Sequence, residues 1–135
     1  MLFPNNLVYS DDIQKDIGGT TPKTFTQDTK IKVYDNEVHR LAIKYGQNET
    51  LARKIIQCES EIYGQKAKNQ NKDSNGNVWS IDVGRWQINN YFHEKDALKL
   101  GYNIYNEWDN LEYGFIIMKS QGTNPWKASK FCWSK

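Results

Sequence analysis

One carboxylate in this sequence, Glu59, has surroundings that suit acid–base chemistry. Residues 51–64 predict an amphipathic helix, and at about 100° per residue Glu59 falls one turn after Ile55, within the apolar face. A carboxyl group that loses hydration has a raised pKa, which suits a general acid at neutral pH. The alternative is a structural Glu59 at the edge of the face, paired with a Lys or Arg. The apolar face comprises Leu51, Ala52, Ile55, Cys58, Ile62 and Tyr63, and the polar face comprises Arg53, Lys54, Gln57, Ser60 and Glu61.

Asp82 follows a segment that predicts a small antiparallel sheet. Asn75-Gly76 is a strong hairpin signal because both residues tolerate positive φ. The far strand then alternates through residues 78–81 and reaches Asp82, and Gly84 permits a tight turn before Gln87. Asp82 is therefore expected to face the helix of Glu59. Alternatively, its side chain caps the turn 82–84, as Asp does readily.

These elements together resemble the lysozyme and lytic transglycosylase superfamily over about residues 35–133. The resemblance lies in Glu59-Ser60 at a helix end, the Asn-rich hairpin, and Asp82-Val83-Gly84-Arg85-Trp86-Gln87-Ile88-Asn89, which contains the family turn Gly-x-x-Gln-Ile-Asn. Glu59 matches the family acid, and Asp82 matches the second carboxylate of chicken-type lysozymes. Many transglycosylases also have an Asp at this position, which favours a structural role for Asp82. The transglycosylase motif Ala-Tyr-Asn-Ala-Gly is absent.

The resemblance implies an α+β, mainly α, lysozyme-like fold with a small antiparallel β-hairpin beside a helical core. It implies a glycosidase, either a lytic transglycosylase or a lysozyme, that cuts the β-1,4 bond between N-acetylmuramic acid and N-acetylglucosamine in peptidoglycan strands. Glu59 would be the general acid/base. The alternative is a non-catalytic peptidoglycan-binding module on the same fold. Substrate-binding candidates are Ser60, Gln87, Asn89, Tyr91 and Phe92, although a structural role of Gln87 and Asn89 in the turn is equally open.

Two cysteines, Cys58 and Cys132, are similar in placement to those of the resuscitation-promoting factors, a secreted branch of this superfamily. In a secreted wall enzyme they would form a disulfide, whereas in the cytosol they would be two reduced thiols. The chain opens without signal-peptide features and has no apolar run that could cross a membrane. Because of the cysteines, we expect a mature extracellular, periplasmic or cell-wall protein that acts as a monomer. A phage-type endolysin released from the cytosol is the other possibility.

The remaining sequence predicts an irregular N-terminal arm or linker over residues 1–34, with residues 30–34 extended, followed by a catalytic domain over residues 35–135. Helices are expected from Asp35 or Asn36 to Tyr45, over 90–100, and over 108–120 as the buried central helix. Glu112 lies on that central helix and is expected to be structural.

Composition and spacing argue against other classes of function. The net charge of +2 comes from dispersed residues, so no nucleic-acid partner is expected. The segment 73–77 resembles the start of a calcium loop but lacks the required later residues, so no metal or other cofactor is expected.

Overall fold

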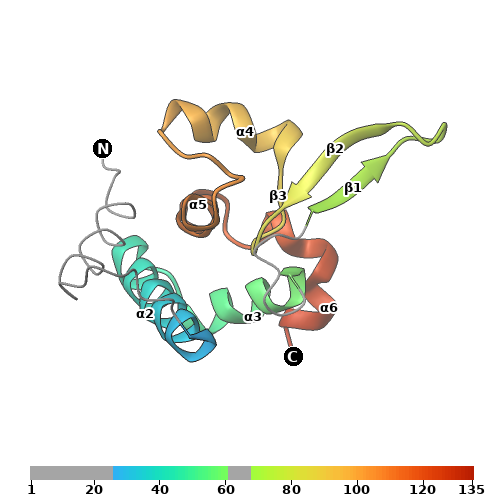
Figure 1. Cartoon of the computed structure of the whole chain (residues 1–135). Helices are drawn as coiled ribbons and strands as arrows, with labels where there is room; N and C mark the ends of the chain where they lie inside the picture. The colour runs from blue at the N-terminus through green and yellow to red at the C-terminus, as the bar shows by residue number, and fades with distance from the viewer. Residues whose placement is uncertain (1–25, 61–67) are drawn as a thin grey trace.

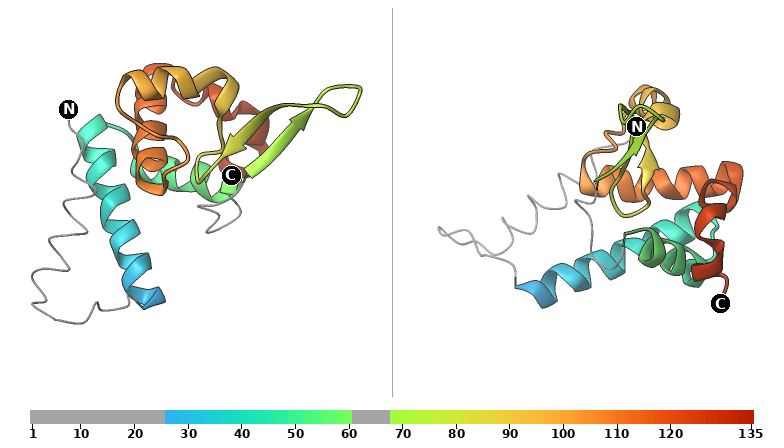
Figure 2. Two further views of the ribbon diagram at one scale, coloured as in Figure 1. Left: turned by 45° about the horizontal axis from the view of Figure 1, so that its top comes forward. Right: turned by 90° about the vertical axis from the view of Figure 1, so that its right-hand side faces the viewer.

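The computed structural model describes residues 26–60 and 68–135, which form a mainly helical α+β fold with one small antiparallel sheet (Figure 1). This confirms the predicted class. The sheet has the order β1-β2-β3, and the hairpin β1–β2 projects away from the helices (Figure 2). The elements are α2 (Gln27–Tyr45), α3 (Glu49–Ser60), β1 (Lys68–Lys72), β2 (Val78–Val83), β3 (Ile88–Asn89), α4 (Asn90–Lys99), α5 (Glu107–Gln121), the 3-10 helix η1 (Asn124–Ser129) and α6 (Lys130–Trp133).

Helix α2 begins earlier than predicted. Its N-cap is Thr26, whose hydroxyl accepts a hydrogen bond from the Thr29 amide, so the prediction that residues 30–34 are extended is wrong. The physical reason lies in Tyr34, whose ring is covered by the Arg85 guanidinium at 3.8 Å from the ring centroid. This contact extends the buried stripe of α2 one turn towards its N-terminus.

Helix α3 is capped by Asn48, whose side chain accepts a hydrogen bond from the Leu51 amide at 2.9 Å. Two details of its predicted faces are wrong. Ser60 is buried rather than polar-facing, and Ile56, absent from the predicted apolar face, is also buried. The Ser60 hydroxyl donates to the Ile56 carbonyl, one turn earlier, which satisfies it inside the core. The predicted continuation to residue 64 lies outside the described residues.

The predicted hairpin turn is confirmed. Asp73 Oδ1 accepts hydrogen bonds from the amides of Asn75 and Asn77, and Gly76 has φ 83°. Next to this turn, the pairing of β1 with β2 has a register shift between Asn71 and Lys72.

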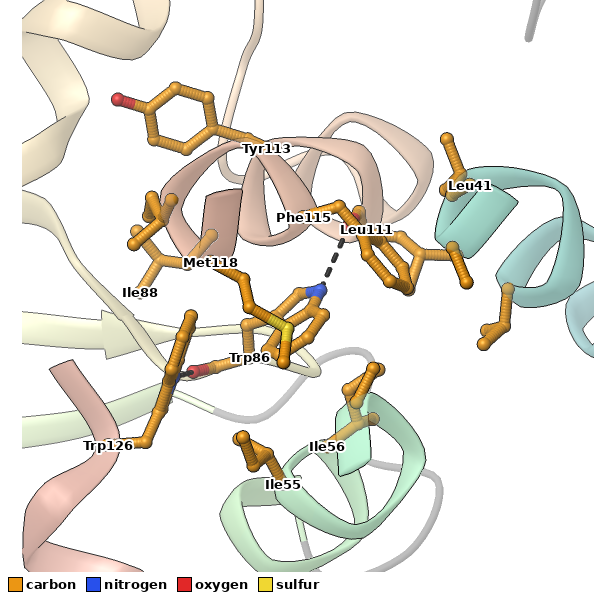
Figure 3. Packing of buried hydrophobic residues seen from close by; sticks show 14 of the residues in the cluster. Leu41, Ile55, Ile56, Trp86, Ile88, Leu111, Tyr113, Phe115, Met118 and Trp126 are labelled. Atoms are coloured by element: carbon orange, nitrogen blue, oxygen red, sulfur yellow. Dashed lines mark hydrogen bonds between the residues drawn. The ribbon is translucent and has the colours of Figure 1, made fainter. Parts of the chain in front are cut away.

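The core surrounds α5, as predicted, and its centre is the fully buried indole of Trp86 (Figure 3). The ring lies against Gly114, where any Cβ would collide with it. Trp86 Nε1 donates to the Leu111 carbonyl at 2.9 Å. The absence of a side chain at one helical position therefore allows the loop before β3 to dock on α5.

Two further tryptophans continue this arrangement towards the C-terminus. Trp126 Nε1 donates to the Trp86 carbonyl at 2.8 Å, and Trp133 Nε1 donates to the Trp126 carbonyl at 3.0 Å. Each indole thus buries its ring and satisfies its single donor on backbone.

A disulfide joins Cys58 in α3 to Cys132 in α6, with their Cα atoms 6.1 Å apart, and confirms the predicted pairing. It closes a loop with a sequence separation of 74 residues. In the chain-entropy account such a loop stabilises the fold by about 4 kcal/mol. None of the helices in the described parts of the chain could span a bilayer.

Glu112 is structural, as predicted. Its carboxylate accepts hydrogen bonds from Lys44 Nζ and the Tyr45 hydroxyl, both at 2.6 Å, and so ties α2 to α5. Burial pushes the pKa of Glu112 up, but the hydrogen bonds and the positive charges of Lys44 and Arg40 outweigh burial, and the pKa lies below its ordinary value.

The contact between Gly114 and Trp86 predicts a costly substitution. Gly114→Ala should lower the free energy of unfolding by about 1–3 kcal/mol, although Ala is the better helix former by about 1 kcal/mol. Urea denaturation measures the change, with the exposed Ser120→Ala in the same helix as control. An unchanged or increased stability would contradict the packing described.

The Glu112 cluster predicts a pH-dependent contribution to stability. Glu112→Gln should cost about 1–3 kcal/mol at pH 7, because it removes a charged hydrogen-bond acceptor from a buried site. The folded-state pKa is lowered, so the wild-type advantage is present above the unfolded-state pKa and disappears as pH falls through the folded-state pKa.

Urea denaturation at several pH values between 7 and 2 checks this dependence. The matched control is Asp96→Asn, which removes an exposed pair with Lys99 and should change stability by less than about 0.5 kcal/mol. A wild-type advantage that grew on acidification would exclude the assignment.

Candidate active site

Glu59 is the penultimate residue of α3 and is half-buried. Burial raises the pKa of its carboxyl, a hydrogen bond from Ser129 opposes that rise, and the negative charge of Asp82 adds to it. No Lys or Arg of the described segments forms an ion pair with Glu59. Within segments 26–60 and 68–135, the structural alternative of an acid neutralised by a basic neighbour is therefore not formed.

Ser129 contacts this acid from the other end of the chain. Its hydroxyl lies within hydrogen-bonding distance of Glu59 Oε1 and is 3.1 Å from the Trp126 carbonyl. No sequence pattern predicts this contact, because the two residues are 70 positions apart and belong to no common motif. The nearest indirect signal is the predicted pairing of Cys58 with Cys132, which brings α3 and α6 together.

Asp82 lies in polar surroundings, unlike Glu59. Its carboxylate accepts hydrogen bonds from Asn89 Nδ2 at 2.8 Å and Asn71 Nδ2 at 3.1 Å. Both amides also donate to the Ser80 hydroxyl at 3.0 Å. Both hydrogen bonds come from the neighbouring strands, so Asp82 is held by the sheet and does not cap the turn 82–84.

The strand register explains why these four side chains meet. Asp82 pairs with Asn89 on β3, and Ser80 pairs with Asn71 on β1. Residues two apart on a strand share a face, and directly paired residues point the same way. The Asn-rich β1 therefore does more than form the predicted hairpin, because its Asn71 amide holds the Asp82 carboxylate.

Gln87 and Asn89 use their amides within the protein. Gln87 accepts a hydrogen bond from Asn69 Nδ2, donates to the Gly84 carbonyl at 2.9 Å, and has φ 50°, a rare conformation for a residue other than glycine. Asn89, besides binding Asp82, accepts a hydrogen bond from the Phe92 amide as the N-cap of α4. Both residues therefore position the turn and the carboxylate beside it.

The remaining candidates divide between the core and a separate surface. The Ser60 side chain is buried in the core, and its hydroxyl donates a hydrogen bond to the Ile56 carbonyl of α3 itself. Tyr91 and Phe92 are 69% and 63% exposed and form an aromatic cluster with Trp79, which the sequence analysis did not single out. Trp79 lies at the register shift of β2, between the pairs Asn71–Ser80 and Lys72–Val78. No hydrogen bond or ring contact among the described residues joins this cluster to Glu59 or Asp82.

No group of three or more His, Cys, Asp or Glu residues in segments 26–60 and 68–135 could hold a metal ion. The site consists of an acid with a raised pKa and a hydrogen-bonded carboxylate on a neighbouring element. In comparisons with known proteins, no family model, no curated protein and no solved structure matches this chain.

Proposed function

We propose that this protein is a peptidoglycan glycosidase with a lysozyme-like fold, in which Glu59 is the general acid and Asp82 is the second carboxylate. The observation that carries the proposal is the contrast between the two groups. Glu59 is desolvated and has a raised pKa, whereas Asp82 accepts two amide hydrogen bonds and acts on Glu59 through its negative charge. Carboxylates in such unlike surroundings can serve as acid and anion at the same pH.

The arrangement of the motifs supports the lysozyme-like assignment. Glu59-Ser60 lies in α3, the Asn-rich hairpin is β1–β2, and the Gly-x-x-Gln-Ile-Asn sequence forms the turn into β3. This order of elements supports the family resemblance. The disulfide supports an extracellular, periplasmic or cell-wall location, because such bonds persist in oxidising compartments. The partner would be a glycan strand, bound by a monomer.

In the proposed reaction Glu59 protonates the glycosidic oxygen of the leaving sugar. Positive charge develops on the other sugar ring, where the ionised Asp82 stabilises it or bonds to the anomeric carbon. Water then releases the product, and Glu59 accepts the proton of that water. Asn71 and Asn89 fix the Asp82 carboxylate and so preorganise the negative charge.

The surroundings of Asp82 favour a hydrolase over a lytic transglycosylase. A transglycosylase uses a hydroxyl of its own substrate as nucleophile and needs a single acid. In a transglycosylase, the Asn71 and Asn89 amides that bind the Asp82 carboxylate would have no catalytic role, although they would still link β1, β2 and β3. On this ground we propose a catalytic role for Asp82, whereas the sequence alone favours a structural one.

Glu59→Gln tests the acid. The variant keeps the shape but not the proton, so clearing of purified peptidoglycan should slow on the order of a hundredfold or more. Folding should be preserved or improved, since the buried carboxylate is costly when ionised. Turbidity measures the rate and circular dichroism checks the fold.

The control is Glu37→Gln, which breaks a pair with Arg40 on α2 and should leave the rate unchanged. Near wild-type clearing by Glu59→Gln would disprove the assignment. Wild-type protein that co-sediments with peptidoglycan without cleaving it would instead identify a binding module.

Asp82→Asn tests the reaction type. A two-carboxylate hydrolase should lose most of its activity, because the substitution removes the anion that supports the cationic ring. Mass spectrometry of wild-type digests should then find muropeptides with free reducing ends. Asp96→Asn, on the exposed surface of α4, serves as the control for loss of a carboxylate. Anhydro-muropeptides, with substantial activity left in Asp82→Asn, would identify a lytic transglycosylase.

A further inference from the structure

We propose that Ser129 is a positioning residue for Glu59, whose hydroxyl satisfies this carboxyl in both of its protonation states. The hydroxyl would accept the proton of the neutral acid and would donate to the carboxylate after that proton has left. The catalytic meaning of this exchange rests on the proposed function. The contact itself rests on geometry alone.

The Ser129 hydroxyl has two possible acceptors, the Glu59 carboxylate and the Trp126 carbonyl. Ser129 Oγ lies within hydrogen-bonding distance of both Glu59 Oε1 and the Trp126 carbonyl, but a hydroxyl has one proton to donate. When Glu59 is ionised, the hydroxyl donates to it. When Glu59 is protonated, the acid donates to Ser129 Oγ, and the hydroxyl proton turns to the Trp126 carbonyl. Rotation of one O–H bond therefore converts one fully paired arrangement into the other.

Covalent and packing contacts hold the hydroxyl in place. Cys132, three residues after Ser129, is bonded to Cys58, which directly precedes Glu59. Trp126, three residues before Ser129, is fixed by the bond of its indole to the Trp86 carbonyl. The acid and its hydroxyl partner are thus held from both sides.

Among the residues that the structure describes, Ser129 is the side chain that donates a hydrogen bond to Glu59. Within the same segments, Asp82 is the charged group that acts on the Glu59 carboxyl, and its effect is repulsive. The basic residues of the packed elements are engaged or exposed. Arg53 binds Asp35 and Glu49, Lys54 binds the Lys135 carbonyl, and Lys127 and Lys130 are exposed.

The exchange has a consequence for the reaction. When Glu59 gives its proton to the glycosidic oxygen, a negative charge appears at a half-buried position near another carboxylate. The Ser129 hydroxyl then turns from the Trp126 carbonyl to the new carboxylate and keeps its own proton. Ser129 thereby stabilises the product of proton transfer without taking part in the transfer.

The experiment compares Ser129→Val with Ser129→Thr, which have the same shape and differ in the hydroxyl. Carbon-13 NMR of side-chain carboxyls, with Glu59 assigned by its absence in Glu59→Gln, follows the titration directly. Loss of the donor to the ionised form should raise the pKa of Glu59 further in Ser129→Val, and Ser129→Thr should restore it. Ser129→Ala repeats the deletion in a smaller side chain. Ser120→Ala removes a hydroxyl that also bonds a carbonyl three residues back and serves as control.

Peptidoglycan cleavage gives a second readout. Ser129→Val should lower kcat on the order of tenfold with little change in KM. Since the acid works while protonated, the basic limb of the pH profile should move to higher pH.

An unchanged Glu59 pKa in folded Ser129→Val and Ser129→Ala would overturn the proposal, as would a shift that Ser129→Thr does not reverse. Wild-type protein without cleavage would refute the proposed function, while the NMR titration would still decide the contact between Ser129 and Glu59.

Discussion

The contact between the Trp86 indole and the bare backbone at Gly114 is the constraint on which the rest of the structure depends. A large ring is fully buried against a helix only because that helix has no side chain at the point of contact. The Leu111 carbonyl satisfies the indole N–H. The loop before β3 is consequently fixed to α5, and the sheet is attached to the helical part through this loop.

The same indole connects both halves of the candidate site. On one side, Gln87 follows Trp86 directly, and Asn89, three residues after Trp86, holds the Asp82 carboxylate. On the other side, the Trp86 carbonyl anchors Trp126, whose own carbonyl accepts the Ser129 hydroxyl beside Glu59. The two carboxylates come from different elements, and a shared core contact determines how those elements are placed. Glu59 and Asp82 can therefore have surroundings of different polarity, and neither has a basic partner among the residues that the structure describes.

The elements that were predicted correctly depend on local chemistry. The phase of Glu59 in α3, the turn at Asn75-Gly76 and the buried α5 all follow from periodicity or turn preferences within a short window. The failures came from contacts between distant segments. Tyr34 extends α2 because Arg85 covers its ring, and Ser129 reaches Glu59 only after the chain has closed on itself. Neither contact leaves a periodic trace in the sequence. The family resemblance located Asp82, but its amide partners depend on strand register, which the sequence does not specify to one residue.

The disulfide has a topological consequence. Cys58 directly precedes Glu59, and Cys132 lies three residues after Ser129, so the covalent loop closes at the candidate site itself. A single backbone cleavage anywhere between these cysteines, for instance at the projecting tip of the hairpin, would leave both fragments covalently linked. The segment with the acid and the segment with its hydroxyl partner would remain tethered to each other. A nicked chain could thus retain the geometry around Glu59, which would be an advantage for a protein exposed to proteases.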